Sequence, residues 1–495
     1  MGDARPRRRT GRRARSLVRH AGSLDVSART LGSPNGYGHY DTARLTEFHT
    51  ALDAARDSMY TRAERIPLDQ LAQWSADPDS GNIRHASGKF YTIQGVDVSV
   101  AGPAGTRQWH QPIINQPEIG ILGILVKQFD GVPHYLMQLK AEPGNINGIQ
   151  VSPTVQATRS NYTRVHGGNP VPYLDYFRER DRHRVIADVR QSEQGSWFLL
   201  KRNRNVIIEV AGDVPVLDGF HWLTIQQIHE LLQVDDLVNM DARSVLSCLP
   251  FLDLMPATMA LDRDERVLSL IRSWSGDRRS VHDTADLLSW ITDVRTVTDI
   301  EVHDAPLNRL PQWRYGADVI SHETDRFFDV IGVRVEAGGR EVGRWDQPMV
   351  AARHVGLAAF VVARFDGVLH VLVGMRVEPG FADVAEIAPT VQCTPANLDH
   401  GDIARPPFLD VVLDAPEDRV LYDTMLSEEG GRFFQTRNRY VIVEVDEQLE
   451  HPGFRWMTLH QLTELVRHSH YVAMQARTLL ACTATLATTR DGAAR

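Results

Sequence analysis

The strongest constraint on this fold is an internal duplication that runs through most of the 495-residue chain. The stretch SEQGSWFLLKRNRNVIIEV, from Ser192, pairs without a gap with SEEGGRFFQTRNRYVIVEV, from Ser427, and eleven of the nineteen positions are identical. Further pairs follow in the same order, at separations that drift only from 239 to 234 residues. Because single cores stop growing near roughly 250–300 residues, the sequence predicts a tandem duplication of one domain.

Each copy predicts an α+β domain with a mixed sheet. Apolar runs flank Asp130 and Asp366, each followed by glycine, and Asp-Gly between two such runs favours a tight hairpin. The segments VIIEV and VIVEV are typical of buried strands. A Thr-x-x-Gln pattern at Thr224 and Thr458 then predicts the start of a closing helix, because this pattern forms a capping box.

The repeats set the expected domain boundaries. We expect a first repeat over 37–255, a linker over 256–279, a second repeat over 280–485 and a short tail over 486–495. Residues 1–36 open with an arginine-rich stretch that has eight arginines in its first twenty residues. A nucleic-acid arm or a targeting peptide would fit that stretch, but a disordered tail is the simpler interpretation.

Composition narrows the class of protein. The net charge of -9 gives no reason to expect a nucleic-acid partner, and no apolar run approaches the roughly 20 residues of a membrane span. The three cysteines lack the close spacing of a disulfide framework or a metal site. We therefore expect a soluble cytoplasmic protein.

A loop that follows Pro-Thr-Val carries matching polar residues in both repeats. Gln156, Thr158 and Asn161 in the first repeat match Gln392, Thr394 and Asn397 in the second. Such short polar side chains can contact a ligand, although the same residue types often cap the backbone of a loop.

Two arginines, separated by one asparagine, lie at the start of a predicted strand in each repeat. The matching residues are Arg202 and Arg204 in the first repeat and Arg437 and Arg439 in the second. A spacing of two places both arginines on one face of a strand, and arginine forks bind phosphate through paired hydrogen bonds. A diphosphate is therefore a suitable target, and an ion pair with Glu193 or Glu209 is the alternative.

A tryptophan ends the first block that the repeats share. Trp74 closes IPLDQLAQW, and Trp313 closes APLNRLPQW. An indole ring at this position could stack on a nucleobase, but tryptophans more often pack against other side chains.

The sequence shows no signature of a redox cofactor or a metal. It has neither a GxGxxG motif that opens a helix nor a Walker-type phosphate loop. His85 and His166 have no ligand partners at metal spacing, and there is no Ser-His-Asp set with a nucleophile elbow. We therefore expect no cofactor and no metal.

Longer motifs resemble those of the NDP-hexose 2,3-dehydratases of deoxysugar biosynthesis. In the first half they are NGIQVSPTVQATRSNYTRVHGGNPVPYLDYF, from Asn147, and DVRQSEQGSWFLLKRNRN, from Asp188. In the second half they are APTVQCTP, PFLD and LSEEGGRFFQTRNRYVIVEV. The resemblance covers nearly everything from about Tyr40 to Thr485.

This resemblance implies two tandem Nudix-like α/β/α domains, a nucleotide-sugar pocket in each repeat and a homodimer. The implied substrate is dTDP-4-keto-6-deoxy-D-glucose, and the implied product passes to a 3-ketoreductase. The metal-binding Nudix box is absent, since SEEGG is only a vague match and SEQGS has lost one acid. Without several carboxylates on one helical face, dehydration is favoured over metal-dependent hydrolysis.

We expect the first repeat to hold the catalytic pocket. Its loop TRSNYTRVHGG is richer than TPANLDHGDIA in the second repeat, where Leu398 replaces Tyr162 and Arg376 replaces Lys140. Tyr162 and Glu193 are the candidates for the acid–base pair, although an ion pair with Arg202 or Arg204 would equally explain Glu193. Lys140 or Arg159 could stabilise an enolate or the diphosphate. The expected substrate-binding residues are Trp74, Gln156, Thr158, Arg159, Ser160, Asn161, Arg202, Arg204, Trp313, Gln392, Thr394, Pro395, Asn397, Arg437 and Arg439.

Two other functions stay open at this point. A Nudix-type nucleotide-sugar pyrophosphohydrolase would require a metal and would release dTMP. A non-enzymatic nucleotide-sugar-binding protein would require that both pockets have lost their chemistry.

Overall fold

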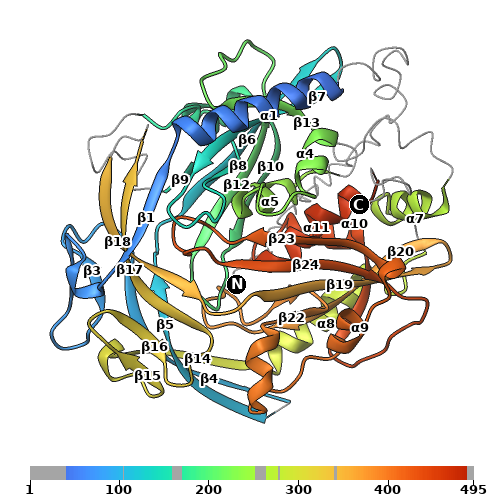
Figure 1. Ribbon diagram of the computed structural model, residues 1–495. Coiled ribbons are helices and arrows are strands. Elements are labelled where there is room, and N and C mark those ends of the chain that lie inside the picture. The colour runs from blue at the N-terminus through green and yellow to red at the C-terminus, as the bar shows by residue number, and fades with distance from the viewer. Residues whose placement is uncertain are drawn as a thin grey trace, which may run out of the picture.

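The structure is a computed structural model that describes residues 41–103, 105–158, 170–250, 264–276, 279–338 and 343–487. The arginine-rich tail predicted over 1–36 lies outside the described residues, and so do Arg159, Ser160, Asn161 and Tyr162. Helices and strands alternate in both halves of the chain (Figure 1), so the predicted α+β class is confirmed.

Most helices occur in equivalent pairs. The pairs are α1 (Asp41–Ser58) and α8 (Thr284–Thr296), α3 (Leu174–Arg178) and α9 (Leu409–Leu413), α4 (Ile225–Leu231) and α10 (Leu459–Val466), and α5 (Met240–Leu246) and α11 (Met474–Thr483). Helix α7 (Glu265–Trp274) has no described partner and lies in the stretch expected as a linker. Within the described ranges, no helix is both long and apolar enough to cross a membrane.

The strands of the two halves also correspond. Those of the first half are β1 (Thr61–Ile66), β2 (Trp74–Ala76), β3 (Ile83–His85), β4 (Thr92–Gly102), β5 (Gly105–Asn115), β6 (Gly120–Phe129), β7 (Val132–Ala141), β8 (Ile149–Ser152), β9 (Val155–Ala157), β10 (Arg184–Ser192), β11 (Phe198–Leu199), β12 (Arg202–Glu209) and β13 (Phe220–Thr224). Those of the second half are β14 (Asp299–Ala305), β15 (Trp313–Tyr315), β16 (Val319–His322), β17 (Phe328–Ala337), β18 (Arg344–Ala352), β19 (Gly356–Phe365), β20 (Val368–Arg376), β21 (Glu386–Ala388), β22 (Val391–Cys393), β23 (Val420–Ser427), β24 (Arg437–Glu444) and β25 (Phe454–Thr458).

Each half builds one mixed seven-stranded sheet. In the first half the order is β10-β12-β6-β7-β13, with β8 paired to β7 and β9 paired to β6. In the second half, β23-β24-β19-β20-β25 repeats this order, with β21 and β22 in the equivalent places. The central pairs β6–β12 and β19–β24 are parallel, and the remaining pairs are antiparallel.

The local sequence signals are confirmed. Asp130 and Gly131 adopt φ values of 51° and 80° between β6 and β7, as a tight Asp-Gly hairpin requires. Asp366 and its glycine do the same between β19 and β20. Both capping boxes are present, at Thr224 before α4 and at Thr458 before α10.

The halves exchange their first strands. Strand β1 of the first half pairs with β17 of the second half, and β14 of the second half pairs with β4 of the first (Figure 1). Each contact needs a glycine on the receiving strand. A Cβ atom at Gly332 would lie 2.5 Å from the carbonyl oxygen of Ile66, and one at Gly95 would lie 2.6 Å from that of Ala305. The two repeats are therefore interlocked.

The largest cluster of buried apolar side chains also crosses the repeat boundary. It joins Val245 and Leu246 on α5 to Leu479 and Leu480 on α11, and it extends to Trp274 on α7. The predicted domain boundaries follow the sequence duplication and stay a prediction, whereas the core itself is continuous between the repeats.

Candidate active site between the repeats

Two equivalent backbone contacts join the Glu-Pro-Gly turn of one repeat to the Ser-Glu-x-Gly turn of the other. The amide of Gly144 donates to the carbonyl of Gly430 at 2.7 Å, and the amide of Gly380 donates to that of Gly195 at 2.8 Å. A Cβ atom at Gly144 would lie 1.8 Å from the carbonyl oxygen of Phe433, so only glycine permits this approach. The Ser-Glu-x-Gly motif, which revealed the duplication, therefore forms the contact between the repeats.

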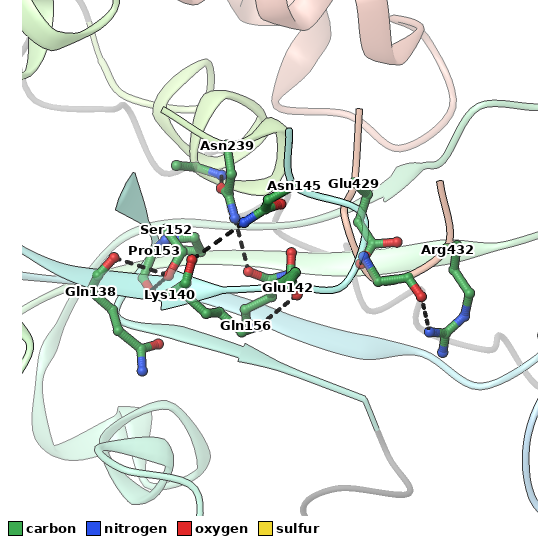
Figure 2. A network of polar contacts seen from close by, with 12 residues as sticks. Gln138, Lys140, Glu142, Asn145, Ser152, Pro153, Gln156, Asn239, Glu429 and Arg432 are labelled. Atoms are coloured by element: carbon green, nitrogen blue, oxygen red, sulfur yellow. Dashed lines mark hydrogen bonds and ion pairs between the residues drawn. The ribbon is translucent and has the colours of Figure 1, made fainter. Parts of the chain in front are cut away.

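A set of polar residues surrounds the first of these contacts, and we call it the first polar cluster. It comprises Lys140, Glu142, Gln156, Asn239 and Asp241 from the first repeat and Glu429 and Arg432 from the second. Figure 2 shows most of these side chains between strands β7 and β9, helix α5 and the turn after β23.

A chain of contacts orders the first-repeat side of this cluster (Figure 2). Lys140 Nζ lies 3.1 Å from Glu142 Oε1, and Gln156 Nε2 donates to the same oxygen at 3.1 Å. Asn239 Nδ2 donates to Gln156 Oε1 at 3.0 Å, while Asn239 Oδ1 caps helix α5. The helix start thereby fixes the amide of Gln156, which in turn fixes the Glu142 carboxylate.

Three carboxyl groups of the region have raised pKa values. Burial and then the neighbouring Glu142 raise the pKa of Glu429 to about 7, against the lowering effects of Arg432 and Lys140. Burial also raises the pKa of Glu193 to about 7. The pKa of Asp241 is raised by burial and then by Glu193, Glu429 and Glu142. Glu429 and Glu193 can therefore hold or release protons near neutral pH.

Asp241 has a further distinguishing feature. It is 3% exposed, and no donor among the described residues reaches its Oδ1 atom. Glu193, by contrast, accepts a hydrogen bond from Asn203 Nδ2 at 2.6 Å. Glu193 therefore has an asparagine partner instead of the arginine partner considered from the sequence.

The equivalent positions around the second contact form the second polar cluster. Its members are Arg376, Glu378, Gln392, Ala473 and Gln475 from the second repeat and Gln194 and Trp197 from the first. Arg376 Nε donates to Glu378 Oε1 at 2.5 Å, and the amide of Ser196 donates to Glu378 Oε2 at 2.9 Å.

Five of the seven positions differ between the two clusters, and three of these exchanges bear on acid–base chemistry. Arginine replaces lysine at Arg376, and glutamine replaces a carboxylic acid at Gln475 and at Gln194. All three residues of the second cluster lack a proton that could be exchanged near neutral pH. The first polar cluster is therefore the one equipped for acid–base chemistry.

Three of the four arginines expected at a diphosphate are held by aspartates. Arg204 donates through Nε and Nη2 to Asp188, both at 2.7 Å, and Arg439 pairs with Asp423 in the same two-pronged way. Arg437 Nη2 lies 3.0 Å from Asp236 Oδ2, across the repeat boundary. The buried Nε atom of Arg202 has no partner among the described residues.

The two tryptophans occupy equivalent places in one apolar cluster. Trp74 Nε1 donates to the carbonyl of Asp346 at 2.7 Å, and Trp313 Nε1 donates to that of His110 at 2.8 Å. The ring centroid of Trp74 lies 4.9 Å from that of Tyr91. Each indole thus bonds to the opposite repeat and packs against neighbouring rings, and stacking on a nucleobase stays a prediction.

The two polar loops differ in form. Gln156 belongs to the first polar cluster, and Thr158 is the last residue described before the segment 159–169. In the second repeat, Thr394 precedes a short 3₁₀ helix, Pro395–His400. Asn397 is buried there, and its backbone oxygen accepts from Arg326 Nη1 at 3.3 Å. Gln392 Oε1 is buried with no partner in the described part of the chain.

Sequence reasoning missed Glu142, Asp241 and Glu429. The Glu-Pro-Gly turn that contains Glu142 is present in both repeats, so the turn itself was a visible signal. The other two could have been found by asking where an acid in one repeat faces an amide in the other. That comparison would have paired Asp241 with Gln475 and Glu429 with Gln194.

Buried acids make the stability of the protein depend on pH. Burial raises the pKa of Glu386, which accepts from the Ser192 hydroxyl, to about 7. In the unfolded chain this carboxyl group loses its proton near its ordinary pKa of 4.5, whereas in the folded protein it keeps the proton up to about pH 7. The free energy of unfolding therefore falls as the pH rises from about 4.5 to 7. The variant Glu386→Gln copies Gln150 of the first repeat. We expect its free energy of unfolding, compared with that of wild type, to be ~2 kcal/mol more favourable at pH 8 than at pH 5.

Urea unfolding of the ligand-free protein at both pH values measures this difference. The exposed Glu417→Gln provides the control, because the same change of acid to amide is made in solvent. Equal pH dependence in wild type and Glu386→Gln would contradict the raised pKa.

Two interlocked α+β repeats, with acids and a lysine gathered at their contact, define a class of protein suited to proton transfer. Among the described residues, no group of three or more histidine, cysteine, aspartate or glutamate side chains is placed to hold a metal ion. The chain belongs to the NDP-hexose 2,3-dehydratase family, whose model matches residues 45–249 and 284–483. The resemblance seen in the sequence is confirmed.

Three relatives are named dTDP-4-dehydro-6-deoxy-alpha-D-glucopyranose 2,3-dehydratase. The chain is 49% identical to the protein of Amycolatopsis orientalis, covering 91% of this chain and 92% of the relative. It is 46% identical to that of Saccharopolyspora spinosa, over 92% and 96% of the two chains. It is 48% identical to that of Streptomyces violaceoruber, over 86% and 94%.

Proposed function

We propose that this protein eliminates water across C2 and C3 of dTDP-4-dehydro-6-deoxyglucose. The observation that carries the proposal is identity of 46–49% to three enzymes named for that reaction. The C4 carbonyl acidifies the C3 proton, so a base can remove it and form an enolate. Loss of the C2 hydroxyl, with a proton from an acid, gives an enol that tautomerises to the 3,4-diketo-2,6-dideoxy sugar.

The first polar cluster is the proposed catalytic centre. Its support is the set of protonatable groups that the second cluster lacks, including Lys140 and Asp241. We assign Lys140 to stabilisation of the enolate oxygen, because a fixed cation beside a developing negative charge lowers the barrier. Glu193 and Tyr162 stay the candidates for acid–base roles. The second cluster would then bind a nucleotide sugar without transforming it, or be a remnant of the duplication.

The remaining parts of the proposal extend beyond the catalytic centre. Each repeat would be Nudix-like, the protein would act as a cytoplasmic homodimer, and a 3-ketoreductase would consume the product. The polar loops, the two tryptophans and the paired arginines described above would contact the nucleotide sugar. Among the arginines, Arg204 also borders a surface cavity of about 510 Å³.

Incubation with the 4-keto sugar nucleotide, without added metal or NADPH, tests the activity. We expect a short-lived diketo product, or free dTDP from its breakdown, detected by mass spectrometry and chromatography. Release of dTMP that depends on a divalent metal would instead support a pyrophosphohydrolase. Binding of the nucleotide sugar without any conversion would support a non-enzymatic protein.

A further inference from the structure

The turn after β23 delivers a carboxylate of the second repeat to the catalytic groups of the first. The Gly144–Gly430 hydrogen bond at 2.7 Å and a return bond from the amide of Gln435 to the carbonyl of Gly144, at 2.8 Å, dock this turn on the Glu-Pro-Gly turn. A Cβ atom at Gly430 would lie 2.9 Å from Cβ of Glu142. Glu429 therefore enters the first polar cluster through main-chain contacts that hold its position.

The side chain of Glu429 is presented to the cluster and is not sealed within the core. It is partly exposed, whereas Glu142, Glu193 and Asp241 are buried. One of its oxygens accepts from the amide of Gly431 at 2.9 Å. The other oxygen has no bond from this turn and stays available to a ligand.

The equivalent residue in the other repeat shows what the carboxylate adds. Gln194 is 1% exposed, and its Nε2 donates to Glu428 and to Met240 Sδ. The amide of Gln194 is thus used in a hydrogen bond to Glu428 of the second repeat and is buried away from any ligand. A carboxylate in the same position cannot donate, and its negative charge adds to the rise that burial causes in the pKa of Glu193.

We propose that Glu429, from the second repeat, is the general base that removes the C3 proton at the centre built around Lys140 and Glu142 of the first repeat. This assignment rests on the proposed function, and it makes the working site a composite of both repeats. The exchange of Gln194 for Glu429 is then one of the changes that separates an active site from an inactive one.

The reaction balances with these groups. The carboxylate of Glu429 takes the C3 proton while the C3–H electron pair forms the C2=C3 bond through the enolate. A second group, for which we take Glu193 as the candidate, gives a proton to the C2 hydroxyl, and the C2–O bond breaks to release water. One proton has moved from acid to base, so a single proton exchange restores the site, and no electrons leave the substrate.

The neighbourhood of Lys140 explains why Glu429 acts as base. The enolate oxygen develops on C4, next to the carbon that loses its proton, so the cation and the base must be neighbours. Both side chains belong to the first polar cluster, and the positive charge of Lys140 opposes the rise that burial causes in the pKa of Glu429. Glu142 holds Lys140 at 3.1 Å and thereby keeps the cation in place.

Glu429→Gln tests the assignment, because it copies the residue that the other repeat carries. We expect turnover to fall by about 10²- to 10⁴-fold, together with loss of solvent deuterium exchange at C3. Binding of dTDP should persist, and the variant should unfold at pH 8 no earlier than wild type, because an acid whose pKa is raised in the folded protein has been removed. Glu386→Gln is the matched control, since it also converts an acid with a raised pKa to the glutamine of the other repeat and should retain turnover.

The outcomes separate the two levels of the proposal. If wild type fails to convert the sugar nucleotide, the proposed function is wrong whatever the variants do. If wild type converts it and Glu429→Gln retains either turnover or C3 exchange, Glu429 is not the base. An equal loss in Glu386→Gln would also overturn the assignment, because any buried acid would then have the same effect.

Discussion

Lys140→Met is expected to lower kcat by about 10²- to 10³-fold while leaving the affinity for dTDP nearly unchanged. Methionine preserves the length and apolar stem of the side chain but removes the charge that would face the enolate oxygen. Lys140 Nζ also lies 3.1 Å from Glu142 Oε1, so its loss removes a positive charge from beside that carboxylate. Steady-state kinetics with the 4-keto sugar nucleotide separates the effect on kcat from that on KM.

Arg376→Met is the matched comparison in the second polar cluster. Arg376 occupies the place of Lys140 and contacts Glu378 in the same way that Lys140 contacts Glu142. We expect its replacement to leave kcat nearly unchanged, because the second cluster has glutamine in the places of Asp241 and Glu429. A larger loss in Arg376→Met than in Lys140→Met would place the chemistry in the second repeat.

Local features of the fold could be predicted from the sequence because short-range geometry determines them. The Asp-Gly hairpins and both capping boxes depend on residues only a few positions apart, and all of them are present. The exchange of β1 and β14 could not be predicted in the same way. Their alternating side chains are compatible with either sheet, and the choice depends on contacts with residues about 200 or more positions away.

For the candidate site, too, the residues in repeated motifs could be predicted, whereas those brought in by tertiary contacts could not. Lys140, Gln156 and Glu193 could be selected because they lie in motifs that repeat within the chain. Glu429 was overlooked because each repeat was expected to form its own pocket, whereas the main chain around Gly144 and Gly430 brings the repeats together. Asp241 was overlooked because an acid in the first turn of a helix is ordinarily a surface residue, and its burial depends on tertiary packing.

The second large effect concerns folding and not catalysis. Arg243 on α5 is fully buried, and its guanidinium donates to the carbonyls of Val238 and, at 2.7 Å, of Ser427 in the other repeat. Burial raises the pKa of Glu428, and the positive charge of Arg243 opposes that rise. Arg243→Met would leave both carbonyls without these donors and Glu428 without this positive charge. We expect a loss of about 3–5 kcal/mol in the free energy of unfolding.

A loss of that size is a large share of the roughly 5–15 kcal/mol that holds a typical protein folded. Urea unfolding followed by circular dichroism should therefore show a much lower midpoint for Arg243→Met. Arg477→Met should behave alike, because Arg477 donates to the carbonyl of Ser192 at 2.7 Å in the equivalent contact. Arg178→Met, at a side chain 60% exposed, should change stability by no more than about 0.5 kcal/mol. Equal midpoints for Arg243→Met and Arg178→Met would show that the buried arginines do not hold the repeats together.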